Sequence, residues 1–300
     1  MLNTAAMRNH AGLAVRLAIY PDKRREPLLP GLPKGTQGSK PWDGGNLLVT
    51  EEQYAEMSGD PTVERFLRPY LQGQQLLQGG KRWCLWLISA EPADLRDSAR
   101  IRKRLDAVRD VRAGSPTRVV QEAANTPGLF VQVRQPKTTY LAFPETSSER
   151  RRYIPAAYCS PEVIAGNTVI VFPDADLWLF GLLQSAMFMT WVKTMAGRLE
   201  SRIRISPDLT YCTFPFPAPE TNRAAIETAA QAVLDTREAH TESTLADLYD
   251  PLAMPADLVK AHRDLDKAVD KAFRSKAFPG DGERLAFLLE RYEEMTTAAA

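Results

Sequence analysis

The chain has 300 residues, of which 44% are hydrophobic and 25% are charged, a composition typical of globular proteins. Its formal net charge is only +1, so a surface for nucleic acid would have to be a local patch of positive charge. The sequence shows no apolar run of the roughly 18 residues that a membrane span needs, no apolar core of a signal peptide, and no cysteine spacing of a zinc site or disulfide framework.

These exclusions favour a cytoplasmic protein without membrane association. Residues 1 to 45 are rich in proline, glycine and basic residues, and Pro21–Pro27 is one of several clusters that break regular structure. This polar, proline-rich segment has one short apolar run, Leu13–Tyr20, and predicts a linker or an edge strand of a larger unit. Cys84 and Cys212 have apolar or aromatic neighbours and are expected to be buried free thiols.

Residues 46 to 218 combine expected helices and strands. Thr50 is a candidate cap of a short helix. Residues 93 to 124 predict a long helix, with Leu105 and Val108 on its apolar side and Arg109 and Arg112 on its polar side. Strands are expected at Trp83–Ile88, Phe130–Val133, Tyr140–Phe143, Tyr153–Ile154 and Thr168–Phe172, and a further helix at Leu177–Leu199.

After residue 218 the chain becomes rich in alanine and in helical spacing. Helices are expected at Thr221–Ala239, Pro255–Phe273 and Gly282–Met295. The predicted class is therefore α+β: a mixed α/β domain over residues 46–218 and a small all-helical C-terminal domain over residues 219–300. Residues 1–45 would be a linker or the remnant of a preceding domain.

The segment from Arg198 to Ile205 alternates charged residues with small or apolar ones. If it is extended, its period of two puts Glu200, Arg202 and Arg204 on one face and the isoleucines on the other. Arginine can bond O6 and N7 of guanine and glutamate can accept from N4 of cytosine, so such a face suits reading of the DNA major groove. A solvated strand of mixed charge is the alternative.

Basic clusters elsewhere in residues 46–218 are candidates for contacts to phosphates. Solvated surface is the alternative for each of them. The candidates for the DNA backbone are Arg134, Lys137, Arg150 and Arg198, with Ser147 and Ser148 as supporting hydroxyls.

Motifs for catalysis are absent from the sequence. There is no glycine-rich loop for nucleotide phosphates or S-adenosylmethionine, and no Asn/Asp-Pro-Pro-aromatic tetrapeptide of amino-methyltransferases. His10, His240 and His262 lack metal spacing and are expected to be structural or solvated. We therefore expect neither catalytic residues nor metal ligands in this chain.

Many ordered stretches together resemble the C-terminal part of the MmeI-type restriction–modification enzymes, which combine methyltransferase and nuclease in one chain. The resemblance covers about residues 41 to 296. The stretches that carry it are Trp42–Leu48 (WDGGNLL), Phe66–Tyr70 (FLRPY), Arg82–Trp86 (RWCLW), Val133–Lys137 (VRQPK), Ser147–Pro155 (SSERRRYIP), Ala196–Leu199 (AGRL), Phe214–Pro217 (FPFP), Leu245–Pro251 (LADLYDP), Met254–Pro255 and the segment from Ala261 to Asp266.

The resemblance implies a DNA target-recognition domain followed by a helical C-terminal domain. In that family the residues at the positions of Glu200 and Arg202 together help specify one base pair. The residue at Arg204 helps specify a neighbouring pair, with a residue that aligns near Thr168. S-adenosylmethionine, and a divalent metal for cleavage, are implied for full-length members of the family and not for this chain.

The family's nuclease, helical and methyltransferase domains would precede residue 1, and residues 1–45 would be a linker or a remnant of that methyltransferase domain. We therefore expect a fragment or one part of a split enzyme. The expected function is recognition of a double-stranded DNA sequence for an adenine-N6 DNA methyltransferase. One rival is a specificity subunit that acts in trans with a separate methyltransferase chain, which would methylate DNA only after mixing. Another is a non-functional remnant or a protein-binding scaffold, which would bind no duplex even at low salt.

Overall fold

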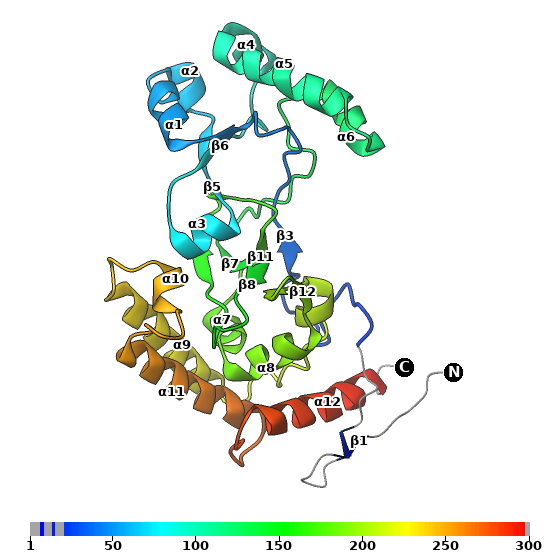
Figure 1. Cartoon of the computed structure of the whole chain (residues 1–300), viewed down its shortest axis with the longest axis vertical. Coiled ribbons are helices and arrows are strands. Elements are labelled where there is room, and N and C mark those ends of the chain that lie inside the picture. The colour runs from blue at the N-terminus through cyan, green and yellow to red at the C-terminus, as the bar shows by residue number, and fades with distance from the viewer. Residues whose placement is uncertain (1–6, 9–13, 16–20, 298–300) are drawn as a thin grey trace.

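The computed structural model describes residues 7–8, 14–15 and 21–297. Figure 1 shows a small α/β lobe at one end, strands in the middle and a group of helices at the other end. Strands β1 (Met7–Arg8) and β2 (Ala14–Val15) pair with each other. The run Leu13–Tyr20, expected to be a linker or an edge strand, lies mostly outside the described residues.

The small lobe is built on a four-stranded sheet in the order β10-β5-β6-β4. Its hydrophobic core is separate from the rest of the molecule and includes Val49, Cys84 and Val108, all with 0% exposure. The lobe contains β4 (Leu48–Val49), α1 (Glu51–Met57), α2 (Pro61–Glu64), β5 (Leu67–Leu71), α3 (Gly73–Gln78), β6 (Trp83–Leu85), α4 (Pro92–Asp97), α5 (Ala99–Ala113), α6 (Arg118–Glu122), η1 (Ala123–Asn125) and β10 (Ile164–Ala165).

The middle of the molecule holds two small sheets, in the orders β3-β11-β7-β9 and β12-β13-β8. Strands β7 and β11 are buried along almost their whole length, because helices and strands cover both of their faces. This burial explains why their sequences are continuous apolar runs rather than alternating ones. The strands are β3 (Thr36–Gln37), β7 (Tyr140–Pro144), β8 (Thr146–Ser147), β9 (Ala157–Cys159), β11 (Val169–Pro173), β12 (Gly197–Leu199) and β13 (Arg202–Arg204).

One hydrophobic core joins the middle sheets to the C-terminal helices. It includes Phe143 from β7, Trp191 from α8 and Leu265 from α11, all buried. The expected domain boundary between residues 218 and 219 therefore crosses a shared core, and it stays a prediction. The helices are α7 (Leu177–Leu183), α8 (Ala186–Met195), η2 (Pro207–Tyr211), α9 (Arg223–Glu238), α10 (Leu245–Leu248), α11 (Ala256–Phe273) and α12 (Asp281–Thr297).

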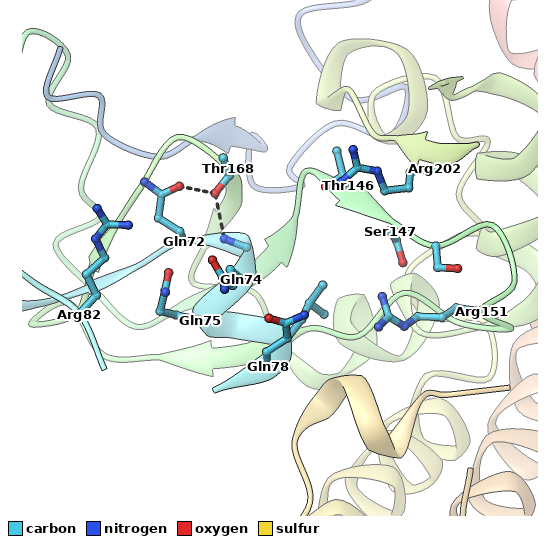
Figure 2. Close-up of a pocket in the computed structure, with 13 residues that line it drawn as sticks. Gln72, Gln74, Gln75, Gln78, Arg82, Thr146, Ser147, Arg151, Thr168 and Arg202 are labelled. Atoms are coloured by element: carbon cyan, nitrogen blue, oxygen red, sulfur yellow. Dashed lines mark hydrogen bonds between the residues drawn. The ribbon is translucent and has the colours of Figure 1, made fainter. Parts of the chain in front are cut away.

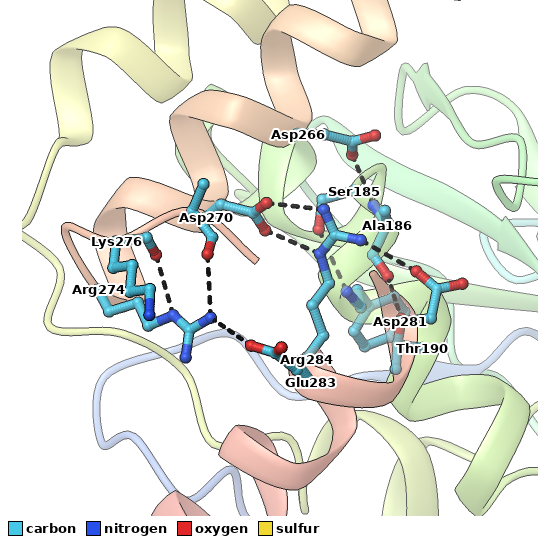
Figure 3. A network of polar contacts seen from close by, with 12 residues as sticks. Ser185, Ala186, Thr190, Asp266, Asp270, Arg274, Lys276, Asp281, Glu283 and Arg284 are labelled. Atoms are coloured by element: carbon cyan, nitrogen blue, oxygen red, sulfur yellow. Dashed lines mark hydrogen bonds and ion pairs between the residues drawn. The ribbon is translucent and has the colours of Figure 1, made fainter. Parts of the chain in front are cut away.

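Partly buried polar contacts fix α8, α11 and α12 to one another (Figure 3). Asp266 on α11 accepts a hydrogen bond of 2.7 Å from the backbone N–H of Ala186, and a second of 2.7 Å from the hydroxyl of Tyr153. Arg284 on α12 binds Asp270 through two hydrogen bonds of 3.0 and 2.7 Å. A two-pronged contact of this kind fixes orientation as well as distance, so it sets the angle between the last two helices.

Mixed helices and sheets confirm the α+β class, but two expected helices are interrupted. The helix expected over residues 93–124 is α4, α5 and α6, because Ser98 caps the start of α5 and Gly114 follows its end. The helix expected at Leu177–Leu199 is α7 and α8, because Ser185 accepts from the N–H of Phe188 and begins a new helix. Its expected last residues are wrong, because α8 ends at Met195 and Gly197–Leu199 form strand β12. Serine inside a helical pattern is thus a cap in both places.

Two of the expected strands are wrong. Residues Phe130–Val133 form only an isolated bridge between Gln132 and Lys40, and Tyr153–Ile154 lies outside regular structure. Phe130 and Ile154 are nevertheless buried, at 5% and 1% exposure. The short apolar runs therefore indicate that these residues are buried, and a buried segment need not be a paired strand.

Arg112 was expected on the polar side of its helix, and the structure instead buries it completely. Its guanidinium donates to backbone carbonyls at 2.7 to 3.1 Å. Ile101, Leu105, Val108 and Arg112 follow helical spacing, so position 112 belongs to the buried face of α5. The accepting residues are Pro41, Trp42, Ala123, Thr126 and Leu129.

Candidate nucleic-acid interface

The charged segment around Glu200 is a β-hairpin. Strand β12 pairs antiparallel with β13, with Leu199 opposite Arg202, so Glu200 and Ser201 form the turn. Glu200 has a φ of 57°, the left-handed conformation that tight hairpin turns require. The expected alternation holds for β13, where Ile203 is fully buried between the exposed Arg202 and Arg204. The expectation that Glu200 lies in the same strand is wrong, because the chain reverses there.

The turn nevertheless keeps Glu200 close to Arg202. Oε2 of Glu200 lies 3.1 Å from Nη2 of Arg202, and the two side chains are 78% and 49% exposed. An ion pair this exposed is weak, because water screens it. Both groups therefore remain able to exchange this contact for one with a ligand.

Arg204 is held by a less exposed carboxylate. Its Nη2 lies 3.3 Å from Oε1 of Glu145, whose side chain is only 13% exposed. The same oxygen accepts a hydrogen bond of 2.9 Å from the side chain of Gln37. Glu145 thus orients the guanidinium of Arg204, while more than half of the Arg204 side chain faces solvent.

Arg198 does not share a face of the hairpin with Arg202 and Arg204. Arg198 lies directly opposite Ile203, and opposite residues of an antiparallel pair share a face. Arg198 therefore leaves the hairpin on the face away from the other two arginines, and its Nη2 donates to the carbonyl of Lys193 at 3.0 Å. A contact of Arg198 with a phosphate stays a prediction.

A polar pocket lies between α3 and β8, and we call it the α3–β8 pocket (Figure 2). It brings together four of the residues predicted from the sequence, Thr168, Ser147, Ser148 and Arg202. The hydroxyl of Thr168 donates to Oε1 of Gln72 at 2.7 Å and accepts from the N–H of Gly73 at 2.9 Å. Thr168 thus joins the start of β11 to the start of α3.

A second pocket, between β3 and β13, contains Arg204 and Arg134 together with Glu145. The remaining backbone candidates, Lys137 and Arg150, are exposed but line neither pocket. The predicted site residues are therefore divided between two pockets and the exposed surface rather than gathered in one cavity.

The α3 side of the first pocket carries residues that the sequence patterns did not indicate. Gln74, Gln75 and Gln78 line it, and so do Arg82 and Arg151. A signal was present, because glutamine occupies four of the seven positions from 72 to 78. By contrast, Gln135 from one of the basic clusters is structural, since its amide group bonds the backbone of Pro161, Val163 and Ala165.

Other potentially reactive side chains are tied up within the fold. Nε2 of His262 lies 2.7 Å from the hydroxyl of Tyr249 in the core, and His240 lies 2.9 Å from Asp257, as expected for structural histidines. His10 lies outside the described residues. Cys84 and Cys212 are buried free thiols, as predicted. Burial raises the pKa of Cys212 to about 11, so this thiol stays protonated at neutral pH.

Within residues 21–297, His, Cys, Asp and Glu side chains form no group of three or more suited to hold a metal ion. Across the same part of the chain, no helix is both long enough and apolar enough to span a membrane.

Two protein families, a bacterial DNA methyltransferase and a solved structure match this chain. The family described as the MmeI target recognition domain matches residues 18–218, and the MmeI C-terminal domain matches residues 218–300. DNA methyltransferase A of Bacillus subtilis (strain 168) is 38% identical over 267 residues, which are 88% of this chain and 30% of that protein. The solved structure of the type IIL restriction-modification enzyme MmeI in complex with DNA is similar with a TM-score of 0.91 and 38% identity.

That similarity covers 95% of this chain and 38% of the MmeI chain. The chain thus spans less than two fifths of the length of either relative. Two adjacent family matches and two relatives at this level of identity agree with the resemblance noted in the sequence. The chain belongs to the MmeI family of restriction–modification enzymes and carries that family's target recognition domain and C-terminal domain.

Proposed function

We propose that this chain recognises a specific sequence in double-stranded DNA for an adenine-N6 DNA methyltransferase system. The observation that carries the proposal is the β12–β13 hairpin, which projects Arg202 and Arg204 to solvent from a buried anchor at Ile203. Arg202 also lines the α3–β8 pocket, whose lining includes arginines, amides and hydroxyls but no carboxylate. The similarity to MmeI, which was solved in complex with DNA, supports the same role.

In this proposal the hairpin reads base edges in the major groove. Glu200 accepts from N4 of cytosine while Arg202 donates to O6 and N7 of the paired guanine. Arg204, oriented by its contact with Glu145, reads a neighbouring pair. Thr168 contributes to that second position through its own side chain or by placing its neighbours, because its hydroxyl is already bonded to Gln72 and Gly73.

Phosphate contacts hold the duplex in register and carry no sequence information of their own. These contacts make the affinity for DNA fall as the salt concentration rises, because each neutralised phosphate releases counterions. That salt dependence can be measured. The candidates for these contacts are Arg134, Lys137, Ser147, Ser148, Arg150 and Arg198.

We assign no catalytic residue to this chain. Methyl transfer from S-adenosylmethionine to an adenine needs the base flipped out of the duplex into a separate pocket. In the proposed system a methyltransferase domain supplies that pocket, either in the same polypeptide or in a partner chain. The recognition module then determines which adenine reaches it.

Selection from a duplex library with a randomised central segment tests the proposal. We expect the chain to enrich a single motif, and to bind it about 10³-fold or more tighter than random duplex at physiological salt. A set of binders without a shared motif, or no binding even at low salt, would contradict sequence recognition.

A further inference from the structure

We propose that helix α3 is a second element that reads bases, with Gln74 and Gln78 contacting the adenine edge of an A·T pair next to the pair read by the hairpin. This inference rests on the proposed function, since it names a further specificity-determining surface of the same site. Gln74 and Gln78 are exposed and four residues apart, so they share one face of α3.

The two sides of the α3–β8 pocket face each other. Figure 2 shows the glutamines of α3 on one side, with Arg202, Ser147 and Arg151 on the other. Arg202 belongs to the hairpin that we assign to base reading. A duplex that places base edges against Arg202 would therefore bring neighbouring edges towards α3.

Several polar atoms of this pocket have no hydrogen-bond partner among the described residues. Oγ of Ser147 is one of them, in a residue only 2% exposed, and Oε1 of Gln75 and Nε of Arg82 are two others. Buried polar atoms without partners cost stability. Their concentration around one pocket is the pattern expected where a polar ligand completes the hydrogen bonds.

The chemistry of α3 fits a base rather than a metal or an apolar group. A glutamine carboxamide has a donor and an acceptor side by side, and these match N7 and the N6 amino group of adenine. Within the described part of the chain, the amides of Gln74 and Gln78 make no hydrogen bond to other protein groups, so both are free to bind. A solvated helix face is the alternative, and it predicts no effect on sequence preference.

The positive charges at the ends of the pocket are suited to bind a polyanion such as the DNA backbone. Arg82, Arg151 and Arg202 line it, and none of its lining residues is acidic. Arg82 lies at the end next to α3 and Arg151 at the opposite end (Figure 2). We assign these two arginines to phosphates on either side of the base pairs that are read.

The position of α3 is rigid enough for reading. Thr168 bonds both Gln72 and Gly73 at the start of the helix, and Leu76 is buried beneath it at 7% exposure. Fixed readers discriminate because a mismatched base leaves their polar groups without partners.

Binding selection with the 300-residue chain tests this inference. The wild-type chain should select a motif that includes an A·T pair. Gln74→Ala with Gln78→Ala should abolish the preference at that pair and weaken binding to the wild-type motif by roughly 5- to 150-fold, while the C·G position of Glu200 and Arg202 is retained. Gln78→Glu removes a donor and should shift the preference at that pair towards C·G, because glutamate accepts from cytosine N4.

Gln121→Ala, on the exposed surface of α6, is the matched control and should leave the motif unchanged. Arg82→Ala and Arg151→Ala should each make the slope of log affinity against log salt concentration less negative by about 0.9, without changing the motif. Thermal unfolding of every variant separates a reading defect from a folding defect.

The outcomes distinguish the two proposals. If the wild-type chain selects no motif, the proposed function fails. If it selects a motif that the folded glutamine variants leave unchanged at every position, the role of α3 is overturned while the proposed function stands. Loss of every position together in a folded variant would also overturn it, since α3 would then shape the pocket without reading a base.

Discussion

The carboxylate of Glu200 and the guanidinium of Arg202 lie side by side at the tip of the β12–β13 hairpin, with Oε2 and Nη2 3.1 Å apart. A C·G pair presents the donor N4 of cytosine beside the acceptors O6 and N7 of guanine in the major groove. The acceptor and donor of the hairpin are thus arranged in the complementary pattern before DNA binds. This relationship is the basis for the reading that we propose at this position.

Salt dependence should reveal the phosphate contacts. Arg134→Ala and Lys137→Ala should each make the slope of log affinity against log salt concentration less negative by about 0.9 on duplex DNA, because each removes one phosphate contact. Lys260→Ala, an exposed lysine on α11, is the matched control and should leave the slope unchanged. Identical slopes in all three variants would show that Arg134 and Lys137 are only solvated surface.

The anchor of the hairpin should be important for stability. Ile203→Ala removes a side chain with 0% exposure and should lower the free energy of unfolding by about 2–5 kcal/mol. Leu199→Ala, on the neighbouring strand at 42% exposure, should change it by less than about 0.5 kcal/mol. Urea unfolding of both variants checks the prediction, and equal effects would mean that the hairpin is not anchored through Ile203.

Arg112 and Arg109 on helix α5 should behave very differently. Arg112→Ala leaves buried carbonyls without their donor and should destabilise the small lobe by about 3–5 kcal/mol. Arg109→Ala removes only an exposed contact with Asp106 and should cost less than about 0.5 kcal/mol. Thermal or urea unfolding measures both, and a mild effect of Arg112→Ala would contradict its buried role.

Asp266 should make stability depend on pH. Burial raises its pKa to about 6, above the ordinary 3.8, so the folded chain holds the proton more tightly than the unfolded chain. The stability gained from protonation is fully present below about pH 4 and is lost as the pH rises towards 6. This group therefore lowers the free energy of unfolding by up to roughly 3 kcal/mol across that window.

Asp266→Asn lacks this titration, and Asn can still accept from the N–H of Ala186. The difference in unfolding free energy between wild type and variant should change between pH 4 and pH 6 and stay constant above it. A difference that does not vary with pH would show that Asp266 is not buried as an acid.

Sequence patterns predicted elements well where local chemistry decides them. Alternation around Ile203 identified the exposed arginines of β13, and the spacing of Leu258 and Leu265 identified the buried face of α11. Patterns were less informative where tertiary contacts decide. Arg112 follows the apolar spacing of α5, yet only the surrounding carbonyls of distant loops make its burial possible.

The candidate site shows the same division. Glu200 and Arg202 were expected on one face of a single strand, and they instead meet across a hairpin turn, 3.1 Å apart. That turn depends on the pairing of β12 with β13 and could not be predicted from alternation. The α3–β8 pocket joins residues far apart in the sequence, such as Gln72 with Ser147 and Arg82 with Arg202, which are 75 and 120 positions apart. No local sequence pattern indicates such proximity, so the sequence alone does not predict that the glutamines of α3 line this pocket.

Exchange of the two hairpin charges tests the central claim most directly. Glu200→Lys with Arg202→Asp inverts the order of donor and acceptor, and each contact of this kind is worth about 1–3 kcal/mol of discrimination. Selection from a randomised duplex library should therefore show a change from C·G to G·C at one position, with the other positions retained. Either single exchange should mainly weaken binding, because it leaves one base edge facing a mismatched group. If the double exchange yields a folded chain that selects the wild-type motif, Glu200 and Arg202 do not read that base pair and the account is contradicted.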